Sequence, residues 1–399
     1  MLKKAFGIDA HKDVMVVTKL GEDIKETRRF GVDADGLRRC IEWLREDSCL
    51  DGVMESTGIY WVPIYASLKD AGFNISVANA YQVRMVPGRK SDQKDSEWLA
   101  YLMRAELIKP SYIPDREYQE LRTLTRLRAR LTQTQTAFKN RAHKILQLCN
   151  IRLASKLTDL FGSSGMKILD ALVNGVSIDE AIEKCDRRVK KQRDEIKASI
   201  IGTLSRTDIF ELKICLDNIK LLEEQIKQVD EKIASKVDKD LVDKLCKIPG
   251  IAPTSAATII AEVGEPKRFE SEKKVSGWSG LAPSHHQSAG VDKRGRITKQ
   301  GSVWLRRTLS QCAKAASTSK SSLAQFYSRV MGRRGKSIAT IALARRILTI
   351  AWRTMITGQE YIEEQFMKKA RYKMIRAKED DYTIDHMAGI LSQASAAIH

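Results

Sequence analysis

The distribution of proline constrains the fold of this chain most strongly. Of its eight prolines, none lies between Pro114 and Pro249, and none follows Pro283. Proline breaks a helix interior because its ring fixes φ and because it has no backbone N–H to donate. The proline-free stretches therefore permit long helices in the middle and at the C-terminal end of the chain.

Two long helices are predicted in the middle of the chain. Residues 115–150 favour a basic helix, and residues 208–238 favour a second helix with apolar residues spaced by threes and fours. That period is typical of a coiled-coil seam, through which we expect self-association. The seam consists of Leu212, Leu216, Ile219, Leu222, Ile226, Val229, Ile233 and Val237.

The first 110 residues alternate between strand-like and helix-like segments. Strands are predicted at 6–8, 14–20, 51–54 and 74–78, and helices at 34–44, 59–69 and 91–106. Such alternation indicates an α/β sheet layered by helices.

Residues 241–360 form a third, mostly helical unit. The segment 245–263 predicts a helix-hairpin-helix, whose tight turn at Gly250 would point backbone N–H groups at a phosphate. A loop is expected from Trp278 to Gly301, followed by helices at 304–316, 323–331 and 337–356. We therefore expect domains at 1–112, 113–240 and 241–360, with a basic helical tail at 361–399.

Net charge and cysteine spacing indicate which partners and which metal or disulfide sites the chain can have. The chain has 399 residues, is 43% hydrophobic and carries a formal net charge of +19. A soluble chain this basic usually binds a polyanion, most often nucleic acid, although a merely basic protein is the alternative. The seven cysteines show no C-x-x-C spacing, so neither a zinc ribbon nor a disulfide framework is indicated. We expect a cytoplasmic protein with no signal peptide and no membrane span.

Four acidic residues stand where a metal-dependent nuclease site needs them. Asp9 ends the apolar run 5–8, and Glu55 ends the run 52–54. Asp92 and Asp95 are three apart at a predicted helix start, so they share one helix face. Phosphoryl-transfer enzymes use such acidic pockets to hold paired Mg²⁺ ions about 3.5–4 Å apart. The alternative for Asp92 is a first-turn acid stabilised by the helix dipole.

Several motifs together resemble the IS one-ten family of bacterial insertion-sequence transposases. The N-terminal matches are Gly7-Ile8-Asp9-Ala10-His11-Lys12, Met54-Glu55-Ser56-Thr57-Gly58-Ile59-Tyr60 and Gly88-Arg89-Lys90-Ser91-Asp92-Gln93-Lys94-Asp95. The C-terminal matches are Pro249-Gly250-Ile251, Gly280-Leu281-Ala282-Pro283, residues 296–301 and residues 329–336. They occur in the family's order from residue 7 to about residue 350.

This resemblance implies a fold and a chemistry. The family's N-terminal domain is a RuvC-like, RNase H-type fold with a D-E-D-D metal site. The resemblance thus implies Asp9, Glu55, Asp92 and Asp95 as ligands of Mg²⁺, with Mn²⁺ as a substitute. The family's C-terminal domain carries a serine that attacks the DNA phosphate and becomes covalently joined to it. The motif places that serine at Ser288, with Ser284 and Ser279 as alternatives in another register.

The resemblance also implies partners. It predicts a homodimer or homotetramer that acts on donor and target DNA of the prokaryotic nucleoid. It also implies a structured guide RNA, the bridge RNA, encoded beside the gene. Specificity would then come from base pairing, while the protein contacts shape and backbone.

Basic residues flank both predicted catalytic motifs. Arg84, Arg89 and Lys90 precede Asp92 and are expected to hold phosphate. Arg294, Arg296 and Lys299 follow Ser288, where they would neutralise the charge of the reacting phosphate or simply bind the DNA backbone.

Two other functions are compatible with the same sequence. An RNase H-like junction nuclease would use the same acidic site with water as the nucleophile. A nucleic-acid binder would carry the acidic residues without catalysis.

Overall fold

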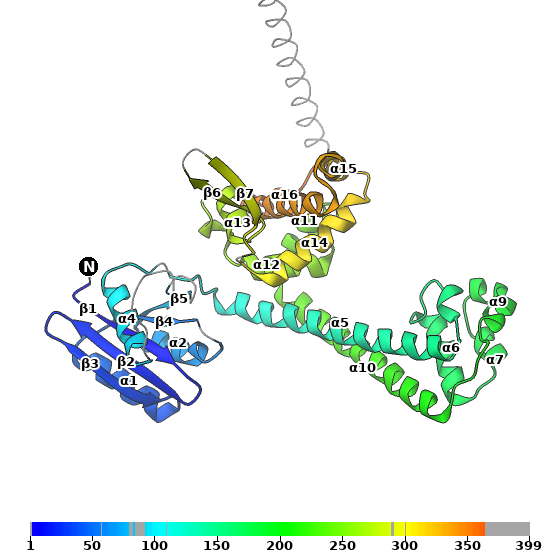
Figure 1. Ribbon diagram of the computed structural model, residues 1–399, viewed down its shortest axis with the longest axis horizontal. Coiled ribbons are helices and arrows are strands. Elements are labelled where there is room, and N and C mark those ends of the chain that lie inside the picture. Colours follow the sequence, from blue (N-terminus) through cyan, green and yellow to red (C-terminus); the bar gives the residue numbers. More distant parts are fainter. Residues whose placement is uncertain are drawn as a thin grey trace, which may run out of the picture. The chain divides into compact units, whose positions relative to one another are not determined.

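The structure, a computed structural model, describes residues 2–56, 58–79, 83, 92–108, 110–288, 291–299 and 301–363. Of the predicted site residues, Arg84, Arg89 and Lys90 lie outside this range, as do the side chains of Asp92, Ser288, Arg294 and Arg296 and most of the predicted tail. The chain divides into two compact units, Met1–Ile113 and Pro114–His399 (Figure 1). No helix in the described part of the chain is long and apolar enough to cross a membrane.

The N-terminal unit is built on a five-stranded mixed sheet, as the α/β prediction required. Its strands lie in the order β3-β2-β1-β4-β5, with the first three antiparallel and with β4 and β5 parallel to β1. The strands are β1 (Lys4–Ala10), β2 (Val14–Gly21), β3 (Lys25–Gly31), β4 (Asp51–Glu55) and β5 (Asn74–Ala78). Strand β3 was not expected from the sequence.

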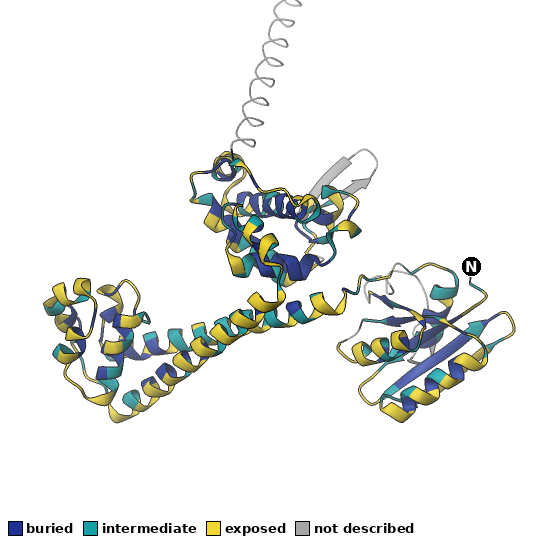
Figure 2. Cartoon of the chain, turned by 180° about the vertical axis from the view of Figure 1, so that it is seen from behind, coloured by how far each residue is buried: buried dark blue, intermediate teal, exposed yellow. Residues whose placement is uncertain are grey.

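One face of this sheet packs against helices α1 (Ala34–Glu46) and α2 (Trp61–Asp70). Phe6 and Ile8 of β1 point into this core, because alternate residues of a strand face opposite sides. Trp43 and Leu44 of α1 close the core from the helix side. Figure 2 shows the buried strands in dark blue and the exposed outer face of α1 in yellow.

Helix α4 (Asp92–Arg104) crosses the opposite face of the sheet and packs on β1. Leu99 of this helix contacts Val53 and Ala78 in a small second core. A Cβ at Gly7 would lie 2.1 Å from the Ser96 carbonyl oxygen and 2.5 Å from the Ala100 nitrogen. Only glycine therefore permits so close an approach of α4 to β1.

The second unit begins with two long helices, α5 (Arg116–Leu148) and α10 (Arg206–Lys236), which pair in antiparallel fashion. The ion pairs between them show the direction. They are Lys236–Glu120, Arg128–Asp230 and Arg141–Glu211. Helix α5 of the same chain covers the predicted seam of α10, where Leu212, Leu216, Ile219 and Leu222 are buried. Self-association in this region thus stays a prediction, and it needs a face other than the 212–222 seam.

Four short helices pack on the distal ends of α5 and α10 around a core of their own. They are α6 (Ser163–Asn174), α7 (Ile178–Glu183), α8 (Arg187–Lys191) and α9 (Arg193–Ala198). Ala142 and Ile145 of α5 and Leu212 of α10 belong to this core. The charge run at 187–191 forms α8, which buries no residue, so it is a solvated helix as favoured from the sequence.

The C-terminal part of the second unit is mostly helical and is organised around α16. Its helices are α11 (Lys239–Cys246), α12 (Pro253–Val263), α13 (Glu272–Trp278), α14 (Val303–Ser317), α15 (Ser322–Arg334) and α16 (Lys336–Thr357). Leu343, Ile347 and Leu348 of α16 are fully buried. Arg126 of α5 forms two hydrogen bonds with the buried carboxylate of Glu262 and so ties α5 to α12.

The prediction of a loop from Trp278 to Gly301 is wrong in its central part. Its centre is an antiparallel hairpin of β6 (Pro283–Ser288) and β7 (Val291–Ile297). The segment is polar and lacks the alternation of a half-buried strand, so its sequence gives no strand signal.

Candidate active site

Two predicted carboxylates lie at the ends of neighbouring parallel strands. The β1–β4 register pairs Gly7 with Val53 and Ile8 with Met54, so Asp9 and Glu55 occupy the next position of each strand. Asp9 shares a sheet face with Gly7, and Glu55 shares that face with Val53. This is the face that α4 crosses, and α4 carries Asp95 in its first turn.

The charges of Glu55 and Asp95 both act on the carboxyl of Asp9. Burial raises the pKa of the Asp9 carboxyl above its ordinary value, the neighbouring His11 lowers it, and the charges of Asp95 and Glu55 raise it again. The Oδ2 atom of Asp9 lies 3.0 Å from Nε2 of His11. Three carboxylates from β1, β4 and α4 therefore contribute to one negative potential.

A buried hydroxyl pair holds the start of α4 in place. Ser96, directly after Asp95, has its Oγ 2.8 Å from the Oγ1 of Thr18 in β2, and Thr18 in turn lies 2.9 Å from Thr27 Oγ1. Both Ser96 and Thr18 are fully buried. Because α4 is fixed at this point, the position of Asp95 is set by the sheet rather than by the helix alone.

The donor chemistry of this cluster suits a hard divalent cation. Carboxylate oxygens are the preferred protein ligands of Mg²⁺. The described side chains do not by themselves form a group of three or more His, Cys, Asp or Glu residues that could hold a metal ion. The side chain of Asp92, the fourth predicted ligand, lies outside the described part, although its backbone begins α4.

The predicted serine lies at the end of the β6–β7 hairpin. Ser288 is the last residue of β6 and pairs with Val291, so only Ala289 and Gly290 separate the two strands in sequence. Arg294 and Arg296 belong to β7, opposite β6.

The two alternative serines have other surroundings. Ser279 is fully buried, donates its hydroxyl to the Ser276 carbonyl at 2.8 Å and accepts from the Leu281 N–H at 3.4 Å. These bonds are those of a structural hydroxyl. Ser284 is half-buried, and its Oγ occupies the space beside Gly295, 2.1 Å from where a Cβ would be.

Close backbone packing and an arginine side chain hold the base of the hairpin against α13 and α14. A Cβ at Gly301 would lie 2.1 Å from the Trp278 carbonyl oxygen. Arg306 of α14 donates to the Gly301 carbonyl at 2.6 Å and to the Ser279 carbonyl at 3.4 Å. Lys299, a predicted DNA contact, is exposed and has a positive φ of 57°.

Gly250 lies in the turn between α11 and α12 with a φ of 89°. A Cβ there would lie 2.3 Å from the Cys312 carbonyl oxygen of α14, so packing alone requires glycine at this position. Its predicted contact with phosphate stays a prediction.

Comparison with known proteins decides the family. A family model described as a transposase of the DEDD, IS110 type matches residues 6–151, and one described as "Transposase IS116/IS110/IS902 family" matches residues 242–328. Together they match more than half of the chain. The protein belongs to the IS110 family of transposases.

Curated relatives of this transposase agree with the family models. A "Probable family 20 transposase" of Pseudomonas aeruginosa is 25% identical over 307 residues, which is 75% of this chain and 82% of the relative. The transposase for insertion sequence element IS1111A of Coxiella burnetii is 24% identical over 366 residues, or 90% of each chain. A pilin gene-inverting protein of Moraxella bovis is 28% identical over 185 residues, 42% of this chain and 58% of the relative.

The two matched regions contain the predicted sites of the transposase. The first includes the four acidic residues, and its mixed sheet is consistent with the RNase H-like domain that this model suggests. The second includes Gly250, the β6–β7 hairpin and Lys299. This chain is therefore a DNA transposase or recombinase.

Sequence reasoning missed four residues that shape the acidic site. Gly7 lets α4 approach, Ser96 and Thr18 fix the start of α4, and His11 pairs with Asp9. Gly7 and His11 lie two residues before and after Asp9 in the same motif. Asking what each residue of that motif contributes to the position or charge of Asp9 would have found them. Thr18 and Ser96 are distant in sequence, and no local pattern joins them.

Proposed function

We propose that this transposase cuts and rejoins the DNA of an insertion sequence through a divalent-metal site of four carboxylates and a serine nucleophile. Asp9, Glu55, Asp92 and Asp95 form the metal site, and Ser288 is the nucleophile. The observation that carries the proposal is geometric: Asp9 and Glu55 end neighbouring parallel strands on the sheet face that α4 crosses, and Asp95 lies in the first turn of α4.

The carboxylates repel one another, and a cation relieves that repulsion. Like charges placed together disfavour ionisation, and a bound cation reverses this preference. Mg²⁺ is the ion proposed, with Mn²⁺ as a substitute, since the four proposed ligands are carboxylates, whose oxygens are hard ligands. When bound, such an ion supplies Lewis-acid stabilisation of the phosphate and of the oxygens that attack and leave.

Ser288 takes part in a balanced exchange of ester bonds. Its Oγ loses a proton and bonds to phosphorus, while the bond from phosphorus to a deoxyribose oxygen breaks and that oxygen takes up a proton. A phosphoserine ester preserves the energy of the DNA linkage for rejoining. A serine hydroxyl needs activation by a base or a metal, which is why the serine and the carboxylate site are proposed to act in one reaction.

The basic residues have a supporting role in this proposal. Arg294, Arg296 and Lys299 neutralise charge at the reacting phosphate or hold the neighbouring backbone, and Arg84, Arg89, Lys90 and Gly250 bind DNA or RNA phosphates. The net charge of +19 supports polyanion binding in general. A guide RNA encoded beside the gene selects donor and target DNA, and two or four copies of the chain assemble on them.

Strand transfer by matched variants tests the metal site. Purified protein, guide RNA, donor and target duplexes and Mg²⁺ are incubated, and joined products are measured. We expect Asp9→Asn to lose strand transfer while it still binds RNA. As a control, Asp51→Asn removes a carboxylate from the start of β4, at the other end of that strand from Glu55, and should recombine normally. Normal recombination by Asp9→Asn would refute the metal site.

A further inference from the structure

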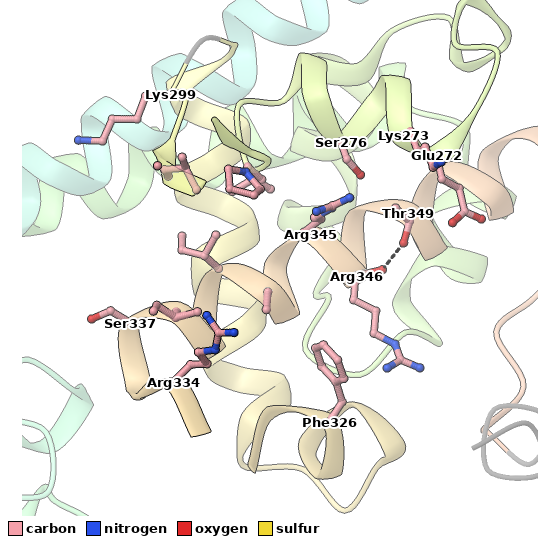
Figure 3. A pocket seen from close by; sticks show the side chains of 17 residues that line it. Glu272, Lys273, Ser276, Lys299, Phe326, Arg334, Ser337, Arg345, Arg346 and Thr349 are labelled. Carbon is pink, nitrogen blue, oxygen red and sulfur yellow. Dashed lines mark hydrogen bonds between the residues drawn. The ribbon is translucent and has the colours of Figure 1, made fainter. Parts of the chain in front are cut away.

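A large cavity lies in the C-terminal part of the second unit, between the base of the β6–β7 hairpin and helices α13, α15 and α16 (Figure 3). Its volume is about 1320 Å³. Pockets for small molecules measure roughly 300–1,000 Å³, so this cavity is large enough for a segment of a polymer.

The described lining combines apolar walls with positive charge. Leu281, Ile297, Phe326, Ile338 and Ile341 form the apolar part. The lining cations are Lys273, Lys299, Arg334, Arg345 and Arg346. The one carboxylate among the described lining residues, Glu272, forms an ion pair with Arg353. The charge of the cavity therefore complements an anion that also has apolar surface.

A buried hydroxyl in the wall lacks a partner. Ser276 of α13 is 1% exposed, and its Oγ makes no hydrogen bond with any described residue. Leaving a buried polar group unsatisfied destabilises a fold, so such a group points to a missing partner. Figure 3 shows Ser276 and Arg345 pointing toward the same part of the cavity.

Across the cavity from Ser276, an arginine side chain stacks on an aromatic ring. The Arg346 guanidinium lies over the Phe326 ring, 4.6 Å from its centroid (Figure 3). Nucleic-acid-binding proteins stack unpaired bases on guanidinium planes and aromatic rings. Paired bases hide their faces inside the duplex, so an apolar cavity of this kind suits only unpaired nucleotides.

We propose that this cavity binds an unpaired segment of a DNA strand, with bases against Phe326, Arg346 and the isoleucines, phosphates at the lysines and arginines, and one polar group at Ser276. The proposal rests on the proposed function, since recombination separates strands. Strand β6 links the cavity to the nucleophile, because Pro283 lines it and Ser288 ends the same strand, roughly 17 Å further at 3.3 Å per residue.

Metal-free binding tests this site without testing catalysis. Fluorescence anisotropy in EDTA measures the Kd of the full chain for a labelled DNA strand of about 16 nucleotides, the upper site size of single-strand modules. The same sequence as a duplex and as RNA serves for comparison. Ser276→Ala and Arg345→Ala are the test variants. Arg333→Ala is the matched control, because this exposed arginine of α15 is not among the described lining residues.

We expect each test variant to bind the DNA strand about threefold to tenfold more weakly, the effect of one lost hydrogen bond, with duplex binding unchanged. Arg333→Ala should leave the Kd for the DNA strand and the Kd for the duplex unchanged. Ser276→Ala should fold at least as stably as the wild type, so loss of fold does not explain the result.

Three outcomes would overturn the proposal. They are equal losses for strand and duplex, no loss in either test variant, and tighter binding of the RNA strand with the same sensitivity to both variants. Because no metal is present, failure here leaves the carboxylate and serine proposal standing. Conversely, loss of strand transfer in Asp9→Asn does not bear on the cavity.

Discussion

Gly7 and Ser96 approach so closely that a methyl group on Gly7 would lie 2.1 Å from the Ser96 carbonyl oxygen. This approach brings α4, and with it Asp95, onto the face of β1 that carries Asp9. A single glycine therefore connects the fold of the N-terminal unit with the geometry of its carboxylates.

Gly7→Ala should separate α4 from the sheet. Overpacking costs about 1–3 kcal/mol of unfolding free energy, and the displaced Asp95 should abolish strand transfer. Gly332→Ala in α15 is the control, since its added Cβ has no atom within 4 Å beyond its chain neighbours and the backbone of its own helix. That change should stabilise the helix by about 0.5–1 kcal/mol. Urea unfolding of both variants checks the prediction, and an unchanged midpoint in Gly7→Ala would contradict it.

The Arg126–Glu262 pair should hold α5 to the C-terminal helices. Glu262 is 1% exposed and accepts from Arg126 at 2.7 and 2.9 Å. Glu262→Ala leaves a partly buried arginine without its partner and should cost about 3–5 kcal/mol. Asp170→Ala breaks the exposed pair with Lys220 and should cost at most about 1 kcal/mol. If denaturant unfolding shows the same loss of unfolding free energy in both variants, burial does not strengthen the Arg126–Glu262 pair.

Self-association should use an exposed apolar stripe of α10. Phe210, Ile214 and Leu221 are 66%, 42% and 56% exposed and share one helix face. Replacing all three by glutamate should convert oligomers into monomers in light scattering. Leu107→Glu, an exposed leucine of the N-terminal unit, should leave the oligomer intact. A triple variant that keeps its mass would exclude this face.

Buried thiols should make the N-terminal unit sensitive to high pH. Burial raises the pKa of Cys40 from 9.0 to about 12 and that of Cys49 to about 11. The folded state keeps these protons after the unfolded state has lost them. The stability they contribute is therefore complete below pH 9.0 and is lost as pH rises toward about 12.

Thiol modification measures the same property. Near pH 8 a thiol reagent should modify the half-buried Cys149 well before Cys40 and Cys49, as mapped by mass spectrometry. Equal rates for all three would mean that the N-terminal core is open.

The sequence predicts the strands that carry Asp9 and Glu55 better than it predicts the edge strand β3. Asp9 and Glu55 follow apolar runs, and such runs are local signals of buried strands. Strand β3 gives no such signal because it lies at the sheet edge and only Phe30 of its seven residues is buried. The β6–β7 hairpin is equally polar, so only the pairing of its two strands in the structure, and no sequence pattern, identifies it.

Contacts between distant segments lie beyond any local pattern. The Thr18–Ser96 bond joins residues 78 apart, and the fit of α4 against Gly7 depends on which helix crosses that strand. The cavity beside α16 likewise arises from four segments, and Ser276 is an ordinary helical serine until its surroundings are known.

A trap for covalent protein–DNA adducts tests the central claim most directly. Protein, Mg²⁺, guide RNA, donor and target duplexes are incubated, separated on a denaturing gel and mapped by mass spectrometry. We predict a DNA adduct on Ser288 that disappears in Ser288→Ala and in Asp9→Asn. Cleaved DNA without any adduct would contradict the serine mechanism and favour a nuclease that uses water, and an adduct on Ser284 or Ser279 would assign the nucleophile to that residue instead.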